Sequence, residues 1–193
     1  MQIQIRENLY IRLQTIEDAP QFFAVIDENR AVLREWLLWI DSIATVDQVE
    51  TTIHEAIENA ERGISYRFNI FANEQILGVV EVKNINRFSD SAQFGYWLAP
   101  DWQGQGIMTD CVRALTTYCF DELNLNSVHI SIAHANKKSR AVPERLNFVQ
   151  EGVLQECMKY HGVYYNEVIY GMLKRNGNYN GNTLSNELIK RIK

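Results

Sequence analysis

The sequence predicts an α/β fold of the α+β kind, with a mixed central sheet of about seven strands and helices on both faces. Helical periodicity covers most of residues 15–62, strand-like segments follow one another over residues 65–98, and helical and strand patterns then alternate to about residue 174. A chain of 193 residues with 46% hydrophobic and 22% charged residues falls within the usual size of one domain. We therefore expect a single domain over residues 1–175.

The first third of the chain reads as one strand followed by helices. Residues 9–13 are predicted to form the first strand, and Thr15 begins a helix-capping sequence. The helical pattern continues over residues 31–39. A further helix is predicted over residues 46–62, and Gly63 ends it.

The middle of the chain changes to a strand pattern. Strands are predicted over residues 65–72, 76–83 and 91–98, where β-branched and aromatic residues are dense. A turn at residues 73–74 and a polar loop at residues 86–90 separate them.

The last third alternates between helices and strands. Apolar residues recur at helical spacing from Met108, and a strand follows near residues 128–133. After a short helix, two closing strands are predicted over residues 152–160 and 164–174. Residues 176–193 are predicted to form a flexible Asn/Gly-rich link and a C-terminal helix.

Composition excludes several classes of function. The formal net charge of −5 argues against direct binding of nucleic acid along an extended surface. The sequence contains no apolar run long enough to span a bilayer and no signal peptide, so we expect a cytoplasmic protein that does not bind membranes. Cys111, Cys119 and Cys157 do not have the spacing of a metal site, so we expect three buried thiols and no metal.

The most informative segment is the turn between the third of these strands and the helix that follows. Pro100 stops the strand, and the turn Gln103 to Gly106 leads into the helix. Backbone N–H groups at a helix N-terminus can hold an anion, and glycines let a ligand approach the main chain closely. An ordinary strand–loop–helix connection is the alternative. Met108 and Thr109 stand where a P-loop or a dinucleotide fingerprint needs other residues, so neither ATP nor NAD fits well.

Two blocks of this sequence resemble the GNAT superfamily of acyl-CoA-dependent N-acyltransferases. Gln103 and Gly106 match the signature Gln/Arg-x-x-Gly-x-Gly/Ala, with Met108 in its last position. Downstream, Asn136 and Ser139 match the family's Asn-x-x-Ser, and a short helix follows. Within the superfamily the sequence is most similar to the branch of bacterial ribosomal-protein serine N-acetyltransferases.

The resemblance implies the GNAT fold, with a V-shaped splay between the fourth and fifth predicted strands. It also implies acetyl-CoA as the acyl donor, with its pantetheine arm in the splay and its diphosphate on the glycine turn. Family members are often dimers, so a homodimer is one expectation. The residues implied to contact acetyl-CoA are Trp97, Leu98, Ala99, Gln103, Gly104, Gln105, Gly106, Ile107, Met108, Asn136 and Ser139.

The resemblance also implies catalytic roles. Ser139 would protonate the leaving thiolate, although a serine at a helix start can instead satisfy local N–H groups. Relatives often carry a glutamate where this chain has Gln93, which cannot accept a proton. Glu81, within an apolar strand, is the best general-base candidate, with simple solvent exposure as its alternative. Further base candidates are Glu156, His161 and Glu167.

The acceptor is expected to be an amine, bound between aromatic walls. Trp36 and Trp39 would form one wall, with Gln93 near them, and the opposite wall would be formed by Tyr160, Tyr164 and Tyr165. Core packing of the tryptophans and cross-strand pairing of the tyrosines are the alternatives. At pH 7, an α-amine of pKa about 7.8 is roughly one-seventh neutral, whereas a lysine near 10.4 is about 0.04% neutral.

A site without a strong base therefore favours a protein N-terminal α-amine, such as that of a basic ribosomal protein. Two alternatives remain open. One is a small amine or an antibiotic as acceptor, and the other is a catalytically weak acyl-CoA-binding regulatory module.

Overall fold

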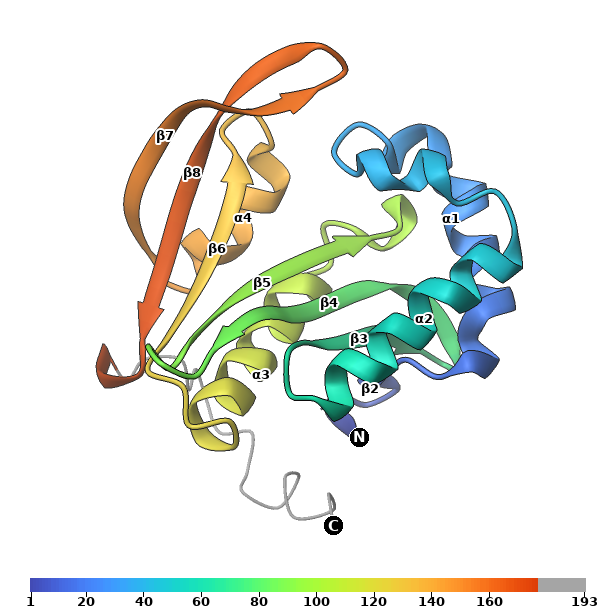
Figure 1. Cartoon of the computed structure of the whole chain (residues 1–193), viewed down its shortest axis with the longest axis horizontal. Helices are drawn as coiled ribbons and strands as arrows, with labels where there is room; N and C mark the ends of the chain where they lie inside the picture. The colour runs from blue at the N-terminus through green and yellow to red at the C-terminus, as the bar shows by residue number, and fades with distance from the viewer. Residues whose placement is uncertain (177–193) are drawn as a thin grey trace.

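The computed structural model describes residues 1–176, and an eight-stranded mixed sheet forms its centre (Figure 1). The spatial order is β1-β2-β3-β4-β5-β6-β8-β7. Within the described chain β5 and β6 form the one parallel pair, and the other neighbours are antiparallel. The strands are β1 (Gln2–Arg6), β2 (Leu9–Leu13), β3 (Tyr66–Ala72), β4 (Gln75–Asn86), β5 (Ser91–Leu98), β6 (Ser127–Ala133), β7 (Val149–Tyr160) and β8 (Val163–Leu173).

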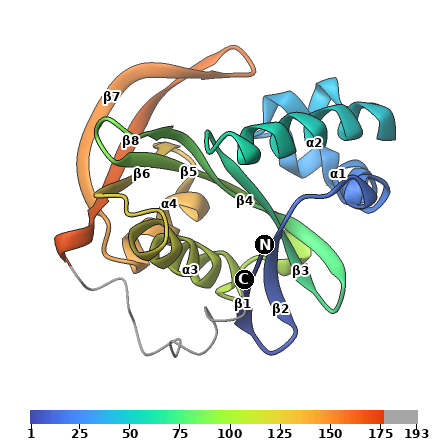
Figure 2. The same ribbon diagram turned by 60° about the horizontal axis from the view of Figure 1, so that its bottom comes forward.

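Helices cover both faces of this sheet. Figure 2 shows α1 and α2 on one side of the sheet and α3 on the other. The α-helices are α1 (Ala19–Leu33), α2 (Val46–Glu61), α3 (Ile107–Asp121) and α4 (Lys137–Arg145). Short 3-10 helices are η1 (Ile16–Asp18), η2 (Leu38–Ser42), η3 (Pro100–Trp102) and η4 (Lys174–Asn176). The predicted fold class is therefore confirmed.

Each face of the sheet has its own hydrophobic core. One core includes Phe94 and Leu115 and joins the sheet to α3 and α4. The other includes Phe22, Ile53 and Trp97 and joins the sheet to α1 and α2. Burial of this apolar surface holds the helices on the sheet.

The structure corrects the prediction of about seven strands. The missed strand is β1, where Ile3 and Ile5 alternate with polar residues and face the core side of the edge. Five residues with only two apolar positions make a weak strand signal. Pairing of β1 with β2, which only the tertiary structure shows, makes it a strand.

The prediction of a continuous helix over residues 31–39 is wrong. Helix α1 ends at Leu33, and the chain turns before η2. The Arg30 guanidinium donates hydrogen bonds to the carbonyl oxygens of Ile40 (2.5 Å) and Ile43 (2.7 Å). These bonds hold the segment folded back on α1.

The expected burial of the cysteines is only partly right. Cys111 and Cys119 are buried in α3, and burial raises the pKa of both thiols, so neither is reactive at neutral pH. Cys157 is exposed, because β7 is an edge strand. The predicted link and C-terminal helix lie outside the described residues, apart from Asn176, which ends η4.

A buried carboxylate, Asp18, joins the start of α1 to the sheet. Its side chain is 6% exposed and accepts hydrogen bonds from Arg12 (2.6 Å), Asn69 (3.1 Å) and the N–H of Thr15 (2.9 Å). Removing one partner of a buried ion pair leaves the other charge uncompensated, which costs about 3–5 kcal/mol.

We expect Asp18→Ala to lower the free energy of unfolding by about 3 kcal/mol, measured by urea denaturation at pH 7. Asp27→Ala is the control, because the Asp27 side chain is 59% exposed and an exposed pair contributes about 0–1 kcal/mol. Equal losses in the two variants would contradict the assigned role of Asp18.

Candidate active site

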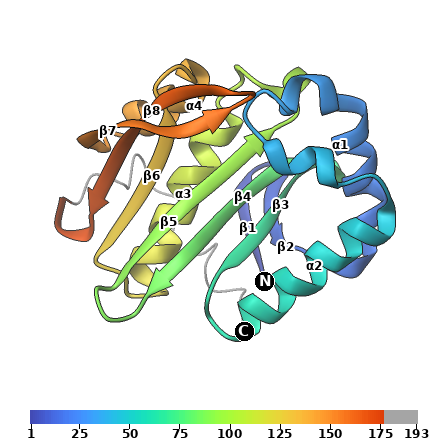
Figure 3. The ribbon, with the colours of Figure 1, turned by 45° about the horizontal axis from the view of Figure 1, so that its top comes forward.

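The strands β5 and β6 separate part-way along their length (Figure 1). Their ladder runs from the Ser91–Ser127 pair to the Phe94–Ile130 pair. Beyond it β5 continues to Leu98 and β6 to Ala133, but these two ends do not pair with each other. This divergence is the predicted V-shaped splay, and Figure 3 shows it from the side on which α1 and α2 lie.

The backbone of β5 decides which groups face the splay. The Ala99 N–H donates to the carbonyl oxygen of Leu77 (2.8 Å), and the Ala99 carbonyl accepts from the N–H of Trp102 (3.0 Å). Backbone groups alternate in direction along an antiparallel ladder, so those of Trp97 also face β4. Of the three predicted backbone partners of the pantetheine arm, only Leu98 has backbone groups that face the splay. The backbone groups of Tyr96, which was not predicted, face it as well.

The side chain of Trp97 is part of the core. It is 9% exposed and packs against Phe22, with 5.8 Å between ring centroids. Gly78 of β4 lies opposite Leu98, and a Cβ atom there would fall 2.2 Å from the Trp97 carbonyl oxygen. Glycine at position 78 therefore permits β4 to lie this close to the end of β5.

The turn before α3 has the backbone geometry of an anion site. Gly104 (φ +77°) and Gly106 (φ +75°) are both left-handed, and Gly106 is the N-cap of α3. The first N–H groups of a helix have no partner within it, so those of Ile107 and Met108 are available to bind an anion at this turn. The Gln103 side chain fixes the turn to β5, because its Nε2 donates to the Leu98 carbonyl (3.0 Å).

Two cations flank the same turn. Arg6 of β1 donates through Nη2 to the carbonyl oxygen of Gln105 (3.3 Å), and Lys138 donates through Nζ to Oε1 of Gln103 (3.2 Å). Asp110 in the first turn of α3 forms ion pairs with Arg6 (2.6 Å) and Arg113 (2.6 Å), which offset its negative charge. Sequence reasoning missed Arg6 because it missed β1.

The other side of the splay carries the start of α4. Asn136 is the N-cap of α4, and its Oδ1 accepts a hydrogen bond from the N–H of Ser139 (3.1 Å). The carbonyl oxygen of Ser139 accepts from the hydroxyl of Tyr96 (2.8 Å). Sequence reasoning also missed Tyr96, although alternation along β5 places it on the same face as Phe94.

Glu81 lies beside the splay. It is opposite Gly95, the first residue of β5 beyond its ladder with β6. A Cβ atom on Gly95 would fall 2.7 Å from Glu81 Oε1, so the glycine leaves room for this carboxylate. The side chain is 20% exposed and contacts Arg67 (3.1 Å) and Lys83 (3.6 Å).

Gln93, which cannot accept a proton, and the base candidates Glu156 and Glu167 lie elsewhere on the sheet. Gln93 is in the paired part of β5, and its Oε1 accepts from Asn84 Nδ2 (2.9 Å). Glu167 of β8 contacts the thiol of Cys157 at 3.4 Å. The N–H of Glu156 donates to the side-chain oxygen of Asn166 (3.0 Å) in an irregular part of β7.

The tip of the β7–β8 hairpin contacts the segment after α1. Trp36 packs edge-on against Tyr160 (5.3 Å between centroids) and Tyr165 (5.6 Å). Nε2 of His161 lies 2.9 Å from the carbonyl oxygen of Arg34. The structure therefore brings Trp36 and Tyr160 into direct contact, so the two rings form one aromatic cluster and do not stand apart as opposite walls. Trp39 lies in η2 and is 43% exposed.

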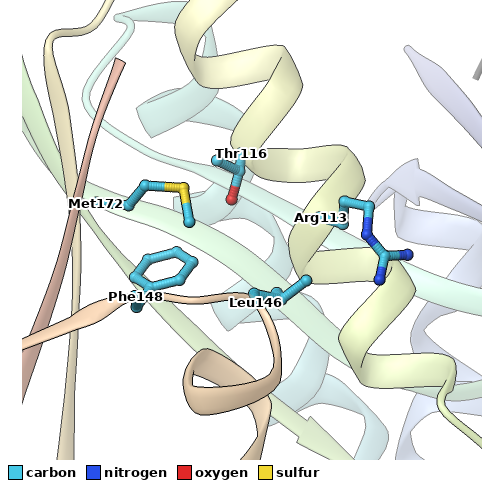
Figure 4. Close-up of a pocket in the computed structure, with 5 residues that line it drawn as sticks. All are labelled: Arg113, Thr116, Leu146, Phe148 and Met172. Carbon is cyan, nitrogen blue, oxygen red and sulfur yellow. The ribbon is translucent and has the colours of Figure 1, made fainter. Parts of the chain in front are cut away.

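A separate small pocket lies between α3, the end of α4 and the strands β7 and β8. It holds about 10 Å³, which leaves room for at most one water molecule, so it does not accommodate a substrate. Figure 4 shows its lining side chains, which are Arg113, Thr116, Leu146, Phe148 and Met172.

Residues 1–176 contain neither a metal-binding cluster nor a membrane-spanning helix. They contain no group of three or more His, Cys, Asp or Glu side chains that could hold a metal ion. None of their helices combines the length and the apolar character that crossing a membrane requires.

Comparison with known proteins decides the family. Residues 8–149 match the model of the acetyltransferase (GNAT) domain. The chain belongs to the GNAT acetyltransferases. The predicted family is therefore confirmed, and so is the enzyme class of an acyl-CoA-dependent N-acyltransferase with acetyl-CoA as donor.

Other GNAT proteins resemble this one over most of its length. YdaF of Bacillus subtilis (strain 168), an N-acetyltransferase by name, is 32% identical over 179 residues, which are 89% of this chain and 94% of YdaF. A spermidine N(1)-acetyltransferase of Vibrio cholerae is 29% identical over 160 residues, 81% of this chain and 89% of that protein. The structure of RimL, described as a ribosomal L7/L12 alpha-N-protein acetyltransferase in complex with coenzyme A, is 25% identical, with a TM-score of 0.87 and coverage of 90% of this chain and 98% of RimL.

Proposed function

We propose that this GNAT enzyme acetylates the N-terminal α-amine of a protein. The observation that carries the proposal is the splay between β5 and β6, which has the anion-binding turn of α3 on one side and Ser139 on the other. A thioester donor held at its phosphates by the turn would extend through the splay toward the face of the sheet that carries Glu81. The named activity of RimL on a ribosomal protein supports this class of acceptor.

Donor binding uses groups from both sides of the splay. The N–H groups at the start of α3 and the nearby Arg6 guanidinium would hold the diphosphate. The backbone groups of Tyr96 and Leu98 that face the splay would pair with the amides of the pantetheine arm. Asn136 caps α4, so it acts by orienting the residues that follow it.

The chemistry is a direct transfer. Acetyl-CoA supplies the acetyl group as a thioester, so a C–N bond to the amine forms while the C–S bond breaks. Ser139 donates a proton to the leaving sulfur and recovers one from solvent. Glu81 accepts the proton that the amine nitrogen loses, and its contacts with Arg67 and Lys83 hold the carboxylate in place.

The acceptor amine would enter below the β7–β8 hairpin. Trp36 and Tyr160 lie at the point where the hairpin meets the segment after α1, and their rings would pack against the first side chains of a peptide. The proposed base is a single carboxylate, that of Glu81, and a carboxylate is a weak base beside an amine. An α-amine, which is partly neutral at pH 7, therefore suits the site better than a lysine.

Thiol release from acetyl-CoA tests the proposed function. The purified protein is mixed with acetyl-CoA and with ribosomal-protein N-terminal peptides, the same peptides blocked at the α-amine, spermidine, or small aminoglycosides. We expect the highest kcat/KM with peptides that have a free α-amine, and acetylation at that amine by mass spectrometry. A preference for spermidine or for an aminoglycoside, or no turnover with any amine, would overturn the proposal.

Ser139→Ala tests the proton donor. We expect kcat to fall about 100-fold, since general acid catalysis contributes about 10²–10⁴-fold, with little change in the dissociation constant of CoA. Ser89→Ala in the loop before β5 is the control. The Ser89 N–H donates to Oδ1 of Asn86, and its hydroxyl pairs with that of Ser91, so these contacts stay within the β4–β5 connection. An unchanged kcat in Ser139→Ala would remove Ser139 from the mechanism.

Glu81→Gln tests the general base through its pH dependence. We expect kcat/KM to fall about tenfold at pH 7 and less at pH 9, where more of the α-amine is already neutral. Glu151→Gln is the control, because Glu151 lies on the same sheet beside His129 (3.5 Å) and away from the splay. A loss in Glu81→Gln that is the same at both pH values would argue against proton transfer to Glu81.

A further inference from the structure

We propose that Tyr96 is a positioning residue that places Ser139 in the splay by holding α4 against β5. This inference rests on the proposed function for the role of Ser139. It goes beyond that function, because it assigns a task to a residue that does not itself react.

The bond from Tyr96 crosses the splay where the backbone ladder does not. Tyr96 is two residues beyond Phe94, the last residue of β5 paired with β6. Its hydroxyl donates to the carbonyl oxygen of Ser139 at 2.8 Å, in the first turn of α4. The two diverging segments are therefore tied together by a side chain.

The sequence of α4 leaves this carbonyl without its usual partner. In an α-helix the carbonyl oxygen of Ser139 would accept a hydrogen bond from the N–H of residue 143. Residue 143 is Pro143, which lies inside α4, is buried, and has no N–H. The Tyr96 hydroxyl supplies the donor that the proline cannot, so these two residues act as a pair.

A second tyrosine holds α4 from the opposite side. The hydroxyl of Tyr170 on β8 donates to Glu144 (2.7 Å) and accepts from Arg140 (2.8 Å). Helix α4 is thus fixed to β8 through Arg140 and Glu144, and to β5 through Ser139 itself. Burial raises the pKa of Tyr96, so its hydroxyl remains a donor throughout the pH range of the assay.

The position of the Ser139 backbone limits where its hydroxyl can lie, because the oxygen is only one rotatable bond away from the backbone. A displacement of a catalytic group by about 1 Å can cost about 100-fold in rate. The proposed diphosphate site lies at the start of α3, and Tyr96→Phe does not alter it. Loss of the Tyr96 hydroxyl is therefore expected to affect kcat more than the binding of CoA.

The test combines two substitutions in the full chain. Tyr96→Phe is expected to lower kcat about tenfold and to lower the thermal midpoint, since it leaves the Ser139 carbonyl without a donor. Adding Pro143→Ala restores an N–H to α4, so the double variant should regain the thermal midpoint. Its kcat should remain low, because the new donor belongs to α4 and no longer ties it to β5.

The control is Tyr118→Phe, another tyrosine of the same core, which packs edge-on against Tyr66 (6.1 Å between centroids). It should leave kcat unchanged. Wild-type kcat in Tyr96→Phe, or recovery of kcat together with stability in the double variant, would overturn the positioning role. Absence of turnover in the wild-type chain would instead overturn the proposed function, so the two failures are distinguishable.

Discussion

Gly106→Val is expected to weaken CoA binding about 100-fold. Gly106 has φ +75° at the N-cap of α3, a conformation in which a β-branched residue is strained by about 1–3 kcal/mol. Valine would drive the backbone out of this region and turn the N–H groups of the first helical turn away from the diphosphate. A 100-fold change corresponds to about 2.7 kcal/mol.

Isothermal titration with CoA measures this effect, and Gly162→Val is the matched control. Gly162 has φ +84° in the turn of the β7–β8 hairpin, and a Cβ atom there has no neighbour within 4 Å. The two valines therefore introduce similar backbone strain at different places. If both variants lost CoA affinity equally, the loss would reflect general destabilisation and the turn would not be the anion site.

Gly78→Ala is expected to lower the free energy of unfolding by about 3 kcal/mol or more. The added Cβ would lie 2.2 Å from the carbonyl oxygen of Trp97 and 2.9 Å from the Cα of Leu98. Both are backbone atoms of β5, so the clash cannot be relieved by rotating a side chain. The strands β4 and β5 would have to move apart where Gly78 faces Trp97 and Leu98.

Urea denaturation measures the loss, with Gly152→Ala as the control. Gly152 of β7 has no neighbour within 4 Å of an added Cβ, and its φ is not positive. It should therefore unfold with nearly wild-type stability. A Gly78→Ala variant that was equally stable would show that β4 and β5 do not approach each other as closely as the structure has them.

Local sequence was sufficient where a single segment contains the whole feature. The glycine turn is such a case, since Gly104 and Gly106 are adjacent to the helix that they begin. The same holds for the cap formed by Asn136, which acts on Ser139 three residues later. Periodicity located most strands and helices for the same reason.

Features that depend on distant contacts could not be predicted in this way. Strand β1 exists because it pairs with β2, and α1 ends early because Arg30 bonds to carbonyls ten or more residues later. Cys157 is exposed because its strand lies at the edge of the sheet. Each of these outcomes depends on a neighbour that periodicity does not reveal.

The sequence by itself determined the family, the α/β class and the position of the glycine turn before α3, because these rest on short motifs and on periodicity. The tertiary structure decided which groups meet in the splay. It turned the backbone of Trp97 and Ala99 toward β4, placed Glu81 over Gly95, and brought the Tyr96 hydroxyl to a carbonyl that Pro143 leaves unpaired. The physical reason is that hydrogen bonds between separate elements form only where packing brings a donor within about 3 Å of an acceptor, and no local pattern encodes that distance.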